Sequence, residues 1–247
     1  EKVAMPVKLP FDFKDIQRVS ITACGTASYA GFVSKYWFER LARLPVDIDV
    51  ASEFRYREMP LSSKDAALFV SQSGETADTL ASLRYCKAQG MQIGAVVNVR
   101  ESTIAREANI TFPTLAGPEI GVASTKAFTC QLSVLASLAI HAARARGKIS
   151  AEGEQALVRN LAEAPRYASL ALKLDSEIQR VAHDVSQAKH ALYLGRDVNF
   201  PLALEGALKL KEISYIHAEG YAAGELKHGP IALIDEDMPV IVIAPYD

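Results

Sequence analysis

The sequence contains few cysteines, and they form no recognisable motif. Cys24, Cys86 and Cys130 are an odd number at wide spacing, and no two of them form a CxxC pair. This usage favours a reducing, cytoplasmic setting and argues against a disulfide framework. Since no pair of histidine or cysteine ligands has the usual spacing beside a carboxylate, we expect neither a metal site nor a cofactor.

Long apolar runs and clusters of one charge are also absent. The longest apolar stretch, VLASLAI at 134–140, is far shorter than the roughly 20 residues that a membrane span needs, and no signal-peptide pattern is present. The formal net charge is −2, and no run contains more than two basic residues. We therefore expect neither a membrane nor a nucleic acid as a partner. Because the sequence starts at Glu1 rather than at a methionine, we expect it to be a piece of a longer protein.

The sequence does contain a regular alternation of strand-like and helix-like segments. Strands are expected at residues 18–24, 46–52, 66–70, 93–99 and 108–115. Helices are expected at residues 29–44, 76–90 and 124–147, followed by polar-rich connecting helices over 151–189. Strands joined by helices of this length form parallel sheets covered on both faces, so the sequence predicts an α/β fold.

The strand–glycine–helix pattern restarts near residue 191 with the sequence ALYLG. Glu53 lies 28 residues after Gly25, and Glu225 lies 30 residues after Gly195. This spacing indicates one α/β unit present twice, as two doubly wound, flavodoxin-like domains of three αβα layers. The expected domains span residues 1–165 and 166–247. The second copy ends after its third strand, which would leave a sheet edge exposed, so we expect it to be truncated.

A polar loop, SQSGET, follows the third expected strand. In an open α/β sheet, ligands bind at the carboxyl ends of the strands, and the start of the next helix offers unpaired N–H groups to an anion. Ser71, Ser73 and Thr76 supply hydroxyl donors. Gln72 supplies an amide donor, and Gly74 permits a tight turn. Because the loop has no lysine or arginine, it suits a monophosphate on a neutral sugar better than a triphosphate.

Two further loops have the same character. CGTAS at 24–28 follows the first strand, and GPEIGVASTKAF at 117–128 enters a helix through Ser124 and Thr125. The alternative interpretation of all three loops is helix capping, for which a single serine or threonine suffices. Three polar helix starts at one sheet edge favour phosphate binding over capping alone.

The last long helix carries charged residues on one face. At about 100° per residue, Glu205, Lys209 and Glu212 fall within about 60° of one another. The opposite face is expected to be buried and comprises Ala203, Gly206, Ala207, Leu210 and Ile213. The simplest interpretation of the charged residues is an exposed, ion-paired face. Alternatively, Glu212 could accept a proton from one sugar carbon and return it to the next, assisted by Lys209.

Residues 217–230, HAEGYAAGELKHGP, are rich in glycine and have no periodicity. We expect irregular backbone here, of the kind that often carries a functional site. His228 is the candidate general acid or base for a ring oxygen, whereas His217 fits a structural role equally well. The remaining histidines are expected on helices, at packing or surface positions: His141, His183 and His190.

Six motifs together resemble the sugar-isomerase (SIS) family and, within it, the isomerase half of the glutamine–fructose-6-phosphate aminotransferases. They are ACGT, ASEFRYR, SQSGETADTL, EIGVASTKAFT, LEGALKLKEISYIHAE and AAGELKHGP. They cover nearly the whole chain, and the last two are specific to these enzymes among SIS proteins. The resemblance implies an enzyme of hexosamine biosynthesis that makes glucosamine 6-phosphate from fructose 6-phosphate and ammonia, which is taken from glutamine.

The resemblance also implies roles for individual residues. The sugar phosphate would be bound by Thr26, Ser71, Gln72, Ser73, Thr76, Val122 and Ser124, with the phosphate at the SQSGET loop. Glu212 would move the proton between C1 and C2 with help from Lys209, and His228 would open the ring. In the family this histidine acts across a subunit interface, so a homodimer is implied.

The sequence departs from the family pattern in three ways. The family usually has a serine after CGT, where this chain has Ala27 followed by Ser28. Either Ser28 substitutes for it, or one hydrogen bond of roughly 1 kcal/mol is missing. The amidotransferase domain and the C-terminal tail with its Schiff-base lysine are absent from these 247 residues. We therefore expect an amidotransferase domain in the parent chain and little catalysis by this piece alone.

Two other functions stay open at this point. Another SIS enzyme, such as a glucosamine-6-phosphate deaminase or a phosphosugar isomerase, would use the same phosphate loop and Glu212, although the motif ELKHGP argues against it. A non-catalytic sugar-phosphate sensor would need the three loops, but it would have no use for Glu212, Lys209 and His228.

Overall fold

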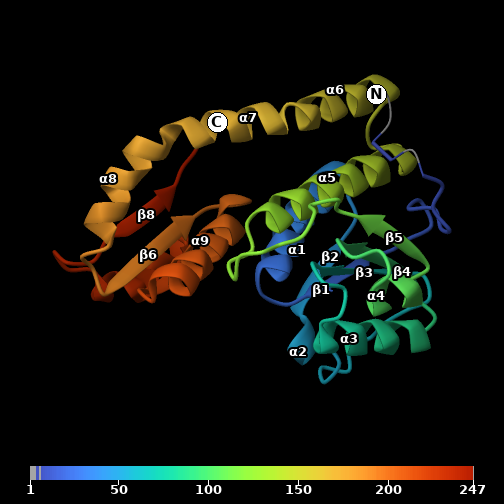
Figure 1. Cartoon of the computed structure of the whole chain (residues 1–247). Coiled ribbons are helices and arrows are strands. Elements are labelled where there is room, and N and C mark those ends of the chain that lie inside the picture. Colours follow the sequence, from blue (N-terminus) through green and yellow to red (C-terminus); the bar gives the residue numbers. More distant parts are fainter. Residues whose placement is uncertain (1–3, 6, 247) are drawn as a thin grey trace. The chain divides into compact units, whose positions relative to one another are not determined.

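The computed structural model describes residues 4–5 and 7–246 of the chain. The chain divides into two compact units, which meet in sequence between Leu161 and Ala162 (Figure 1). Each unit has its own parallel β-sheet, which confirms the α/β class expected from the sequence. No helix among the described residues is both long and apolar enough to cross a membrane.

The sheet of the first unit has five parallel strands in the order β2-β1-β3-β4-β5. Its strands are β1 (Val19–Ala23), β2 (Val46–Val50), β3 (Ala66–Ser71), β4 (Gln92–Val97) and β5 (Ile110–Pro113). Every residue of β1 and β3 is buried, as expected for central strands of a sheet that has helices on both faces. This strand order is the flavodoxin-like one that the sequence predicts.

Helices cover both faces of the first sheet. Helices α1 and α5 pack together on one face, and α3 and α4 lie together on the other (Figure 1). The helical segments are α1 (Gly25–Trp37), the π-helical turn η1 (Phe38–Ala42), α2 (Ala51–Phe54), α3 (Ala77–Ala88), α4 (Thr103–Glu107), α5 (Lys126–Ala145) and α6 (Ala151–Ala162). Phe69, Leu83 and Ile93 are fully buried where α3 packs against the sheet. The first unit therefore has the three-layer arrangement expected from its sequence.

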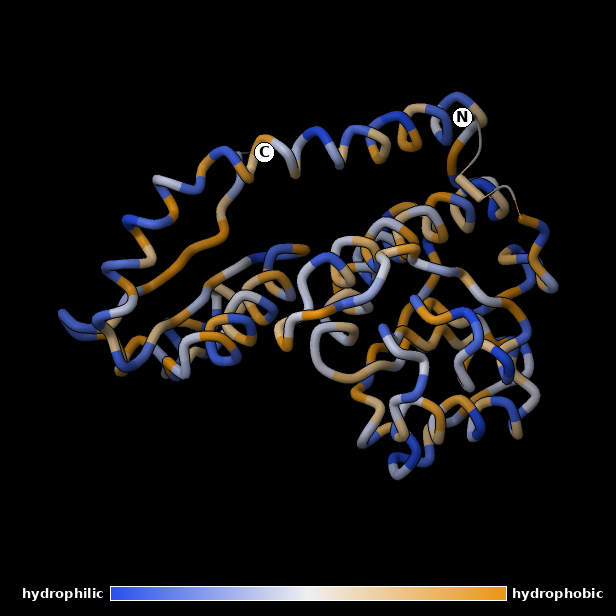
Figure 2. Tube along the Cα trace, viewed as in Figure 1, coloured by the Kyte–Doolittle hydropathy of each residue, from blue (hydrophilic) through white to orange (hydrophobic). Residues whose placement is uncertain are grey.

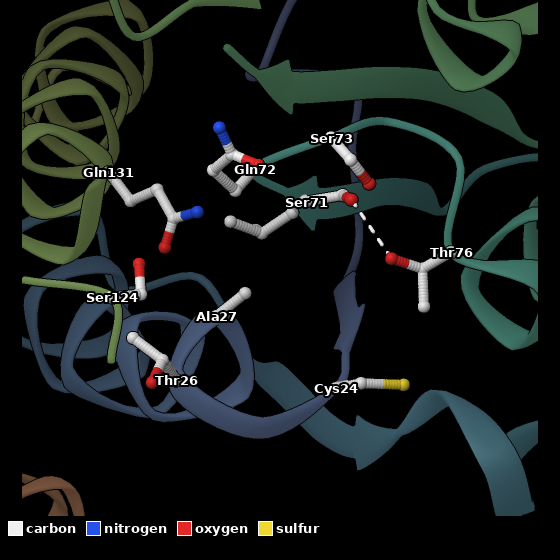
Figure 3. Close-up of a pocket in the computed structure, with 10 residues that line it drawn as sticks. Cys24, Thr26, Ala27, Ser71, Gln72, Ser73, Thr76, Ser124 and Gln131 are labelled. Atoms are coloured by element: carbon white, nitrogen blue, oxygen red, sulfur yellow. Dashed lines mark hydrogen bonds between the residues drawn. The ribbon is translucent and has the colours of Figure 1, made fainter. Parts of the chain in front are cut away.

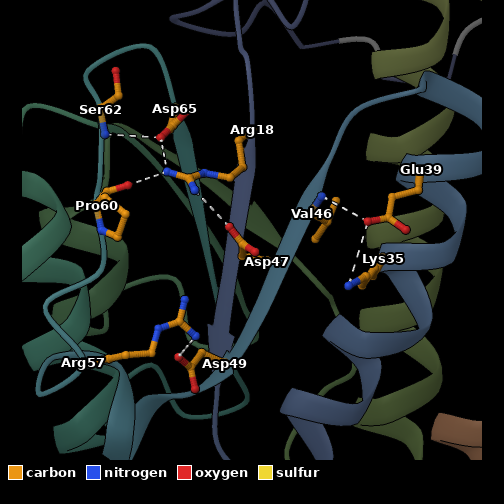
Figure 4. A network of polar contacts seen from close by, with 10 residues as sticks. All are labelled: Arg18, Lys35, Glu39, Val46, Asp47, Asp49, Arg57, Pro60, Ser62 and Asp65. Atoms are coloured by element: carbon orange, nitrogen blue, oxygen red, sulfur yellow. Dashed lines mark hydrogen bonds and ion pairs between the residues drawn. The ribbon is translucent and has the colours of Figure 1, made fainter.

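At the amino ends of the first strands, Arg18 links three segments of the chain (Figure 4). Its Nη2 donates to Asp65 Oδ2 at 2.7 Å and to the Pro60 carbonyl at 2.6 Å, and its Nη1 lies 3.2 Å from Asp47 Oδ2. The side chain of Asp65 is only 4% exposed. This network fixes the start of β3 to β1 and β2, at the end of the sheet opposite the polar loops.

The second unit has three parallel strands in the order β7-β6-β8, which repeats the arrangement β2-β1-β3. Its strands are β6 (His190–Gly195), β7 (His217–Ala222) and β8 (Val240–Ile243). Its helical segments are α7 (Ala164–Ala171), η2 (Leu172–Leu174), α8 (Asp175–Val185), α9 (Asn199–Ser214), η3 (Ala223–His228) and η4 (Pro230–Leu233). Gly206 of α9 lets the ring of Tyr193 on β6 come so close that a Cβ would lie 2.8 Å from it.

The helices α7 and α8 are polar-rich, as the sequence predicts for the connection. Figure 2 shows hydrophilic and hydrophobic residues alternating along them. None of their described residues is buried, and apolar side chains such as Ile178 and Val181 are more than half exposed.

Three expectations for the second unit are wrong. Residues 217–222 are not irregular: they form β7, because they pair in register with β6 although alanine and glycine disfavour strands. His190 lies on β6 and not on a helix. The buried face of α9 is narrower than predicted, since Ile213 is 68% exposed while the helix packs on the sheet through Ala203 and Ala207.

Candidate functional site

A pocket opens in the first unit at the carboxyl ends of β1 and β3 (Figure 3). The winding of the chain reverses between these two strands, which is where open α/β sheets bind ligands. The pocket has a volume of about 190 Å³, below the roughly 300–1,000 Å³ typical for drug-sized ligands, so it suits one end of a small ligand. It is lined by Cys24, Thr26, Ala27, Val70, Ser71, Gln72, Ser73, Thr76, Ser124 and Gln131.

The lining of this pocket is polar but carries no charged side chain among the described residues. Hydroxyl and amide groups from the SQSGET loop, from Thr26 and from Ser124 surround the same space (Figure 3). The structure thus brings together most of the residues for which the sequence predicts ligand contacts: Thr26, Ser71, Gln72, Ser73, Thr76 and Ser124. An uncharged set of donors is the type of lining expected for a monophosphate and not for a triphosphate.

The SQSGET loop orients its hydroxyl groups by hydrogen bonds within the loop. Ser71 Oγ accepts from the Gly74 amide at 3.0 Å and lies 3.2 Å from Thr76 Oγ1. Ser73 Oγ accepts from the Glu75 amide at 3.2 Å. These bonds hold the side chains of Ser71, Ser73 and Thr76 in place before any ligand is present.

Gly74 and Glu75 attach the same loop to α4. Gly74 has a φ of 66°, and a Cβ at this position would lie 2.0 Å from Ser102 Oγ, so only glycine fits the turn. Glu75 Oε1 accepts from the Thr103 amide at 2.7 Å, and this hydrogen bond lowers the pKa of the Glu75 carboxyl. Glu75 therefore anchors the loop and is not one of the residues lining the pocket.

The hydroxyl groups of the loop do not cap α3. In the part of the chain that the structure describes, the N-cap residues Cys24 of α1 and Thr76 of α3 make no side-chain hydrogen bond to their helices. By contrast, Ser102 caps α4, because its side chain accepts from the Ala105 amide. The side chains of these two N-cap residues therefore do not cap α1 and α3, whose amino termini point toward the pocket loops.

In the third polar loop, a side chain does cap the following helix, α5. Glu119 Oε2 accepts from the Ala127 amide at 3.2 Å, so a carboxylate of the chain itself occupies the start of α5. Asn98 fixes the beginning of the loop, since its Nδ2 donates to the Gly117 carbonyl at 2.7 Å. Ser124 is the residue of this loop that reaches the pocket.

Two predicted ligand contacts are not among the residues lining the pocket. Ser28 is buried, and its Oγ donates to the Gly25 carbonyl at 2.7 Å, so its hydroxyl serves the first turn of α1. Ala27, the residue before Ser28, does line the pocket. Val122 is 98% exposed on the loop before α5.

In the second unit, the charged face of α9 forms the ion pairs that its spacing predicts. Lys209 Nζ lies 2.5 Å from Glu212 Oε2 and 3.7 Å from Glu205 Oε1. Glu205 is buried, whereas the side chain of Glu212 is 29% exposed. Lys209 therefore fixes the position of a carboxylate that a ligand can still reach.

The two histidines of the segment 217–230 have different surroundings. His228 is exposed at the end of η3. His217 begins β7, where its Nδ1 lies 3.4 Å from His190 Nδ1 and its Nε2 lies 3.5 Å from Glu219 Oε1. Within the described residues, no group of three or more His, Cys, Asp and Glu side chains could hold a metal ion.

Four residues that line the pocket are not among the contacts predicted from the sequence: Cys24, Ala27, Val70 and Gln131. The first three lie at or just after the carboxyl ends of β1 and β3, so their position follows from the strand ends. Gln131 has a detectable signal of its own, because it interrupts the buried apolar stripe that Ala127 and Leu135 form on α5. A polar residue at a core position of an amphipathic helix indicates either a buried hydrogen bond or a ligand.

Comparison with known proteins identifies the family of the chain. A family model for the SIS domain matches residues 12–141 and 184–247. The chain is 76% identical over 245 residues to a glutamine–fructose-6-phosphate aminotransferase (isomerizing) of Mesorhizobium japonicum, and 71% identical over 247 residues to one of Bradyrhizobium diazoefficiens. These matches cover 99% and 100% of the chain but only 40% and 41% of the relatives. The chain thus spans about 40% of the length of the curated relatives that it matches.

Solved structures give the same result for the fold. The C-terminal domain of glucosamine-fructose-6-phosphate aminotransferase from Francisella tularensis matches with a TM-score of 0.93 and 45% identity, covering 95% of the chain and 66% of that domain. A glucosamine-6-phosphate deaminase from Thermotoga maritima matches with a TM-score of 0.77 and 25% identity, covering 93% of the chain and 68% of that protein.

Proposed function

The chain belongs to the SIS domain family, and from this membership we propose that its parent protein makes glucosamine 6-phosphate from fructose 6-phosphate and ammonia derived from glutamine. The observation that carries the proposal is the 76% identity over 245 residues with an enzyme named for this reaction. The chain would supply the isomerase part. Since it spans 40% of that relative, we assign glutamine hydrolysis to an amidotransferase domain elsewhere in the parent chain.

The phosphate of the sugar binds at the SQSGET loop in this proposal. Ser71, Ser73 and Thr76 donate hydroxyl hydrogen bonds and Gln72 an amide hydrogen bond. The start of α3 is not capped by a side chain, so its N–H groups and helix dipole also favour the anion. Thr26, Ser124 and Val122 are the proposed contacts of the sugar. Ser28 can donate a hydrogen bond to the ligand only by giving up its bond to the Gly25 carbonyl.

Glu212 is the proposed base of the isomerisation. The reaction needs a proton to leave C1 of the open-chain sugar and a proton to reach C2, and one well-placed carboxylate can do both in turn. Lys209, which lies 2.5 Å from Glu212 Oε2, holds the carboxylate in one orientation. The partial exposure of Glu212 supports this role, because a substrate must reach it.

His228 is the proposed acid or base that opens the sugar ring, by exchanging a proton with the ring oxygen. Its exposed position on η3 is compatible with a contribution to a neighbouring subunit, so we propose a homodimer. We also propose a cytoplasmic location, which the free thiols of Cys24, Cys86 and Cys130 support.

The substitution Glu212→Gln in the intact parent protein tests the proposed function. Formation of glucosamine 6-phosphate should fall by about 10²- to 10⁴-fold, the usual effect of removing a general base, while fructose 6-phosphate still binds. Product formation and equilibrium binding are the two measurements. Glu236→Gln, which changes an exposed carboxylate of the same unit, should leave both unchanged.

Other results of this experiment would contradict the proposal. An unchanged rate in Glu212→Gln would remove Glu212 from the proton transfer. A wild-type protein that binds fructose 6-phosphate without turning it over would be a sensor. A protein that only releases ammonia from glucosamine 6-phosphate would be a deaminase.

A further inference from the structure

Gln131 is a buried polar residue whose side chain ends in the pocket of the first unit. It lies on α5, is 2% exposed, and contributes to the pocket lining together with Ser71 and Ser124. Figure 3 shows its amide directed into the pocket, with the carbonyl oxygen on the side of Ser124. That oxygen, Oε1, is buried and has no hydrogen-bond partner among the described residues.

A buried carbonyl oxygen without a partner destabilises the protein that contains it, so such groups are rare unless something else binds there. The neighbours of Gln131 on the buried stripe of α5 are apolar, and a methionine or leucine would fit this stripe without the cost of an unpaired carbonyl. The polar side chain therefore fits a function in ligand binding better than a function in packing.

The chemistry of the oxygen identifies the part of the ligand that it contacts. A carbonyl oxygen only accepts hydrogen bonds, and a phosphate dianion has only acceptors to offer, so the phosphate can be bound by the Nε2 donor of this amide but not by Oε1. A sugar hydroxyl, by contrast, is a donor. We propose that Gln131 recognises a hydroxyl group of the sugar and thereby distinguishes a phosphorylated polyol from a phosphate group alone.

This inference rests on the proposed function, because it assigns the sugar phosphate's hydroxyl-bearing part to one residue of the same pocket. It assigns different parts of the ligand to different residues of the pocket. The hydroxyl donors of Ser71, Ser73 and Thr76 select the anion, and the acceptor on Gln131 selects the carbon chain attached to it.

The substitution Gln131→Met in the intact parent protein tests the inference. Affinity for fructose 6-phosphate should fall about tenfold, because a substrate hydroxyl loses its acceptor, and this loss should exceed the loss for inorganic phosphate, which only the Nε2 donor of Gln131 can contact. The midpoint of thermal unfolding without ligand should stay the same or rise, since the unpaired carbonyl has been removed. Gln131→Leu is measured in the same way as a second variant, and Gln89→Met, at an exposed position of the same unit, is the control.

Three outcomes would overturn the inference. Unchanged affinity for fructose 6-phosphate in both variants would exclude a contact and leave the proposed function intact. An equal loss for fructose 6-phosphate and inorganic phosphate, together with a lower unfolding midpoint, would make Gln131 a packing residue. A wild-type protein that binds inorganic phosphate but no fructose 6-phosphate would overturn the proposed function and this inference together.

Discussion

At the scale of single residues, the serine and threonine hydroxyls of the first unit fall into two groups. Those of Ser28 and Ser102 serve the backbone, through Gly25 and the start of α4. Those of Ser73 and Thr76 line the pocket and cap no helix. Serine and threonine hydroxyls that bond to the backbone of a helix therefore support the fold, and those that do not cap a helix are available to a ligand.

Thr76→Val separates these two functions, because it removes the hydroxyl and keeps the shape of the side chain. Since Thr76 does not cap α3, the unfolding midpoint of the ligand-free protein should shift by no more than about 2 °C. Affinity for fructose 6-phosphate should fall roughly 10- to 150-fold, the loss of one hydrogen bond to a charged group. Calorimetry on the intact protein measures both quantities.

The control for this prediction is Thr129→Val, an exposed threonine on α5 that should leave the affinity unchanged. A lower unfolding midpoint with unchanged affinity in Thr76→Val would show that Thr76 supports the helix and does not contact the ligand.

At the scale of elements, one end of the first sheet is held together by ion pairs and the other end carries the pocket. The amino ends are fixed by Arg18, which joins the segment before β3 to β1 and β2. The carboxyl ends carry the polar loops that line the pocket. A rigid sheet thus holds the two loops after β1 and β3 at a constant separation.

Arg18→Met should lower the free energy of unfolding of the first unit by about 2–4 kcal/mol, because it leaves the buried carboxylate of Asp65 without its cation. Denaturation by urea, followed by hydrogen exchange of the β1 and β3 amides, measures the loss. Arg84→Met removes an exposed ion pair with Glu107 and should have a much smaller effect. Equal effects of the two substitutions would mean that Arg18 does not hold the strands.

Most elements of the fold are predictable from the sequence because their local patterns agree with the tertiary structure. The buried strand β3 begins with the apolar run AALFV, β1 is rich in β-branched residues, and α5 has a clear apolar stripe. Strand β7 was missed because HAEGYA has neither alternation nor β-branched residues, and it forms only through its pairing with β6.

The pocket was predictable only where its residues follow a local sequence pattern. The hydroxyls of SQSGET follow a strand directly, so their position is encoded locally. The contact of Glu119 with the start of α5, the anchoring of the loop by Glu75 and the arrival of Gln131 in the pocket each depend on segments that are distant in sequence. Such contacts follow from the fold and not from a local pattern.

At the scale of the whole molecule, the two units share one strand order but carry different polar residues. The order β7-β6-β8 of the second unit repeats β2-β1-β3 of the first. The first copy carries uncharged donors at its strand ends, and the helix α9 of the second copy carries the ion-paired Glu212. The proposed reaction draws on both copies, with binding of the phosphate assigned to one and proton transfer to the other.

The central claim is that the parent protein aminates and isomerises a sugar that it holds by its phosphate. The most direct measurement is the formation of amino sugar by the intact protein from glutamine and either fructose 6-phosphate or unphosphorylated fructose, with inorganic phosphate as inhibitor. We predict turnover of fructose 6-phosphate, competition by phosphate, and a kcat/KM for fructose lower by about 10²-fold or more, because the energy of phosphate binding is lost from the transition state. Equal turnover of the two sugars, or no amino sugar from fructose 6-phosphate, would contradict the claim.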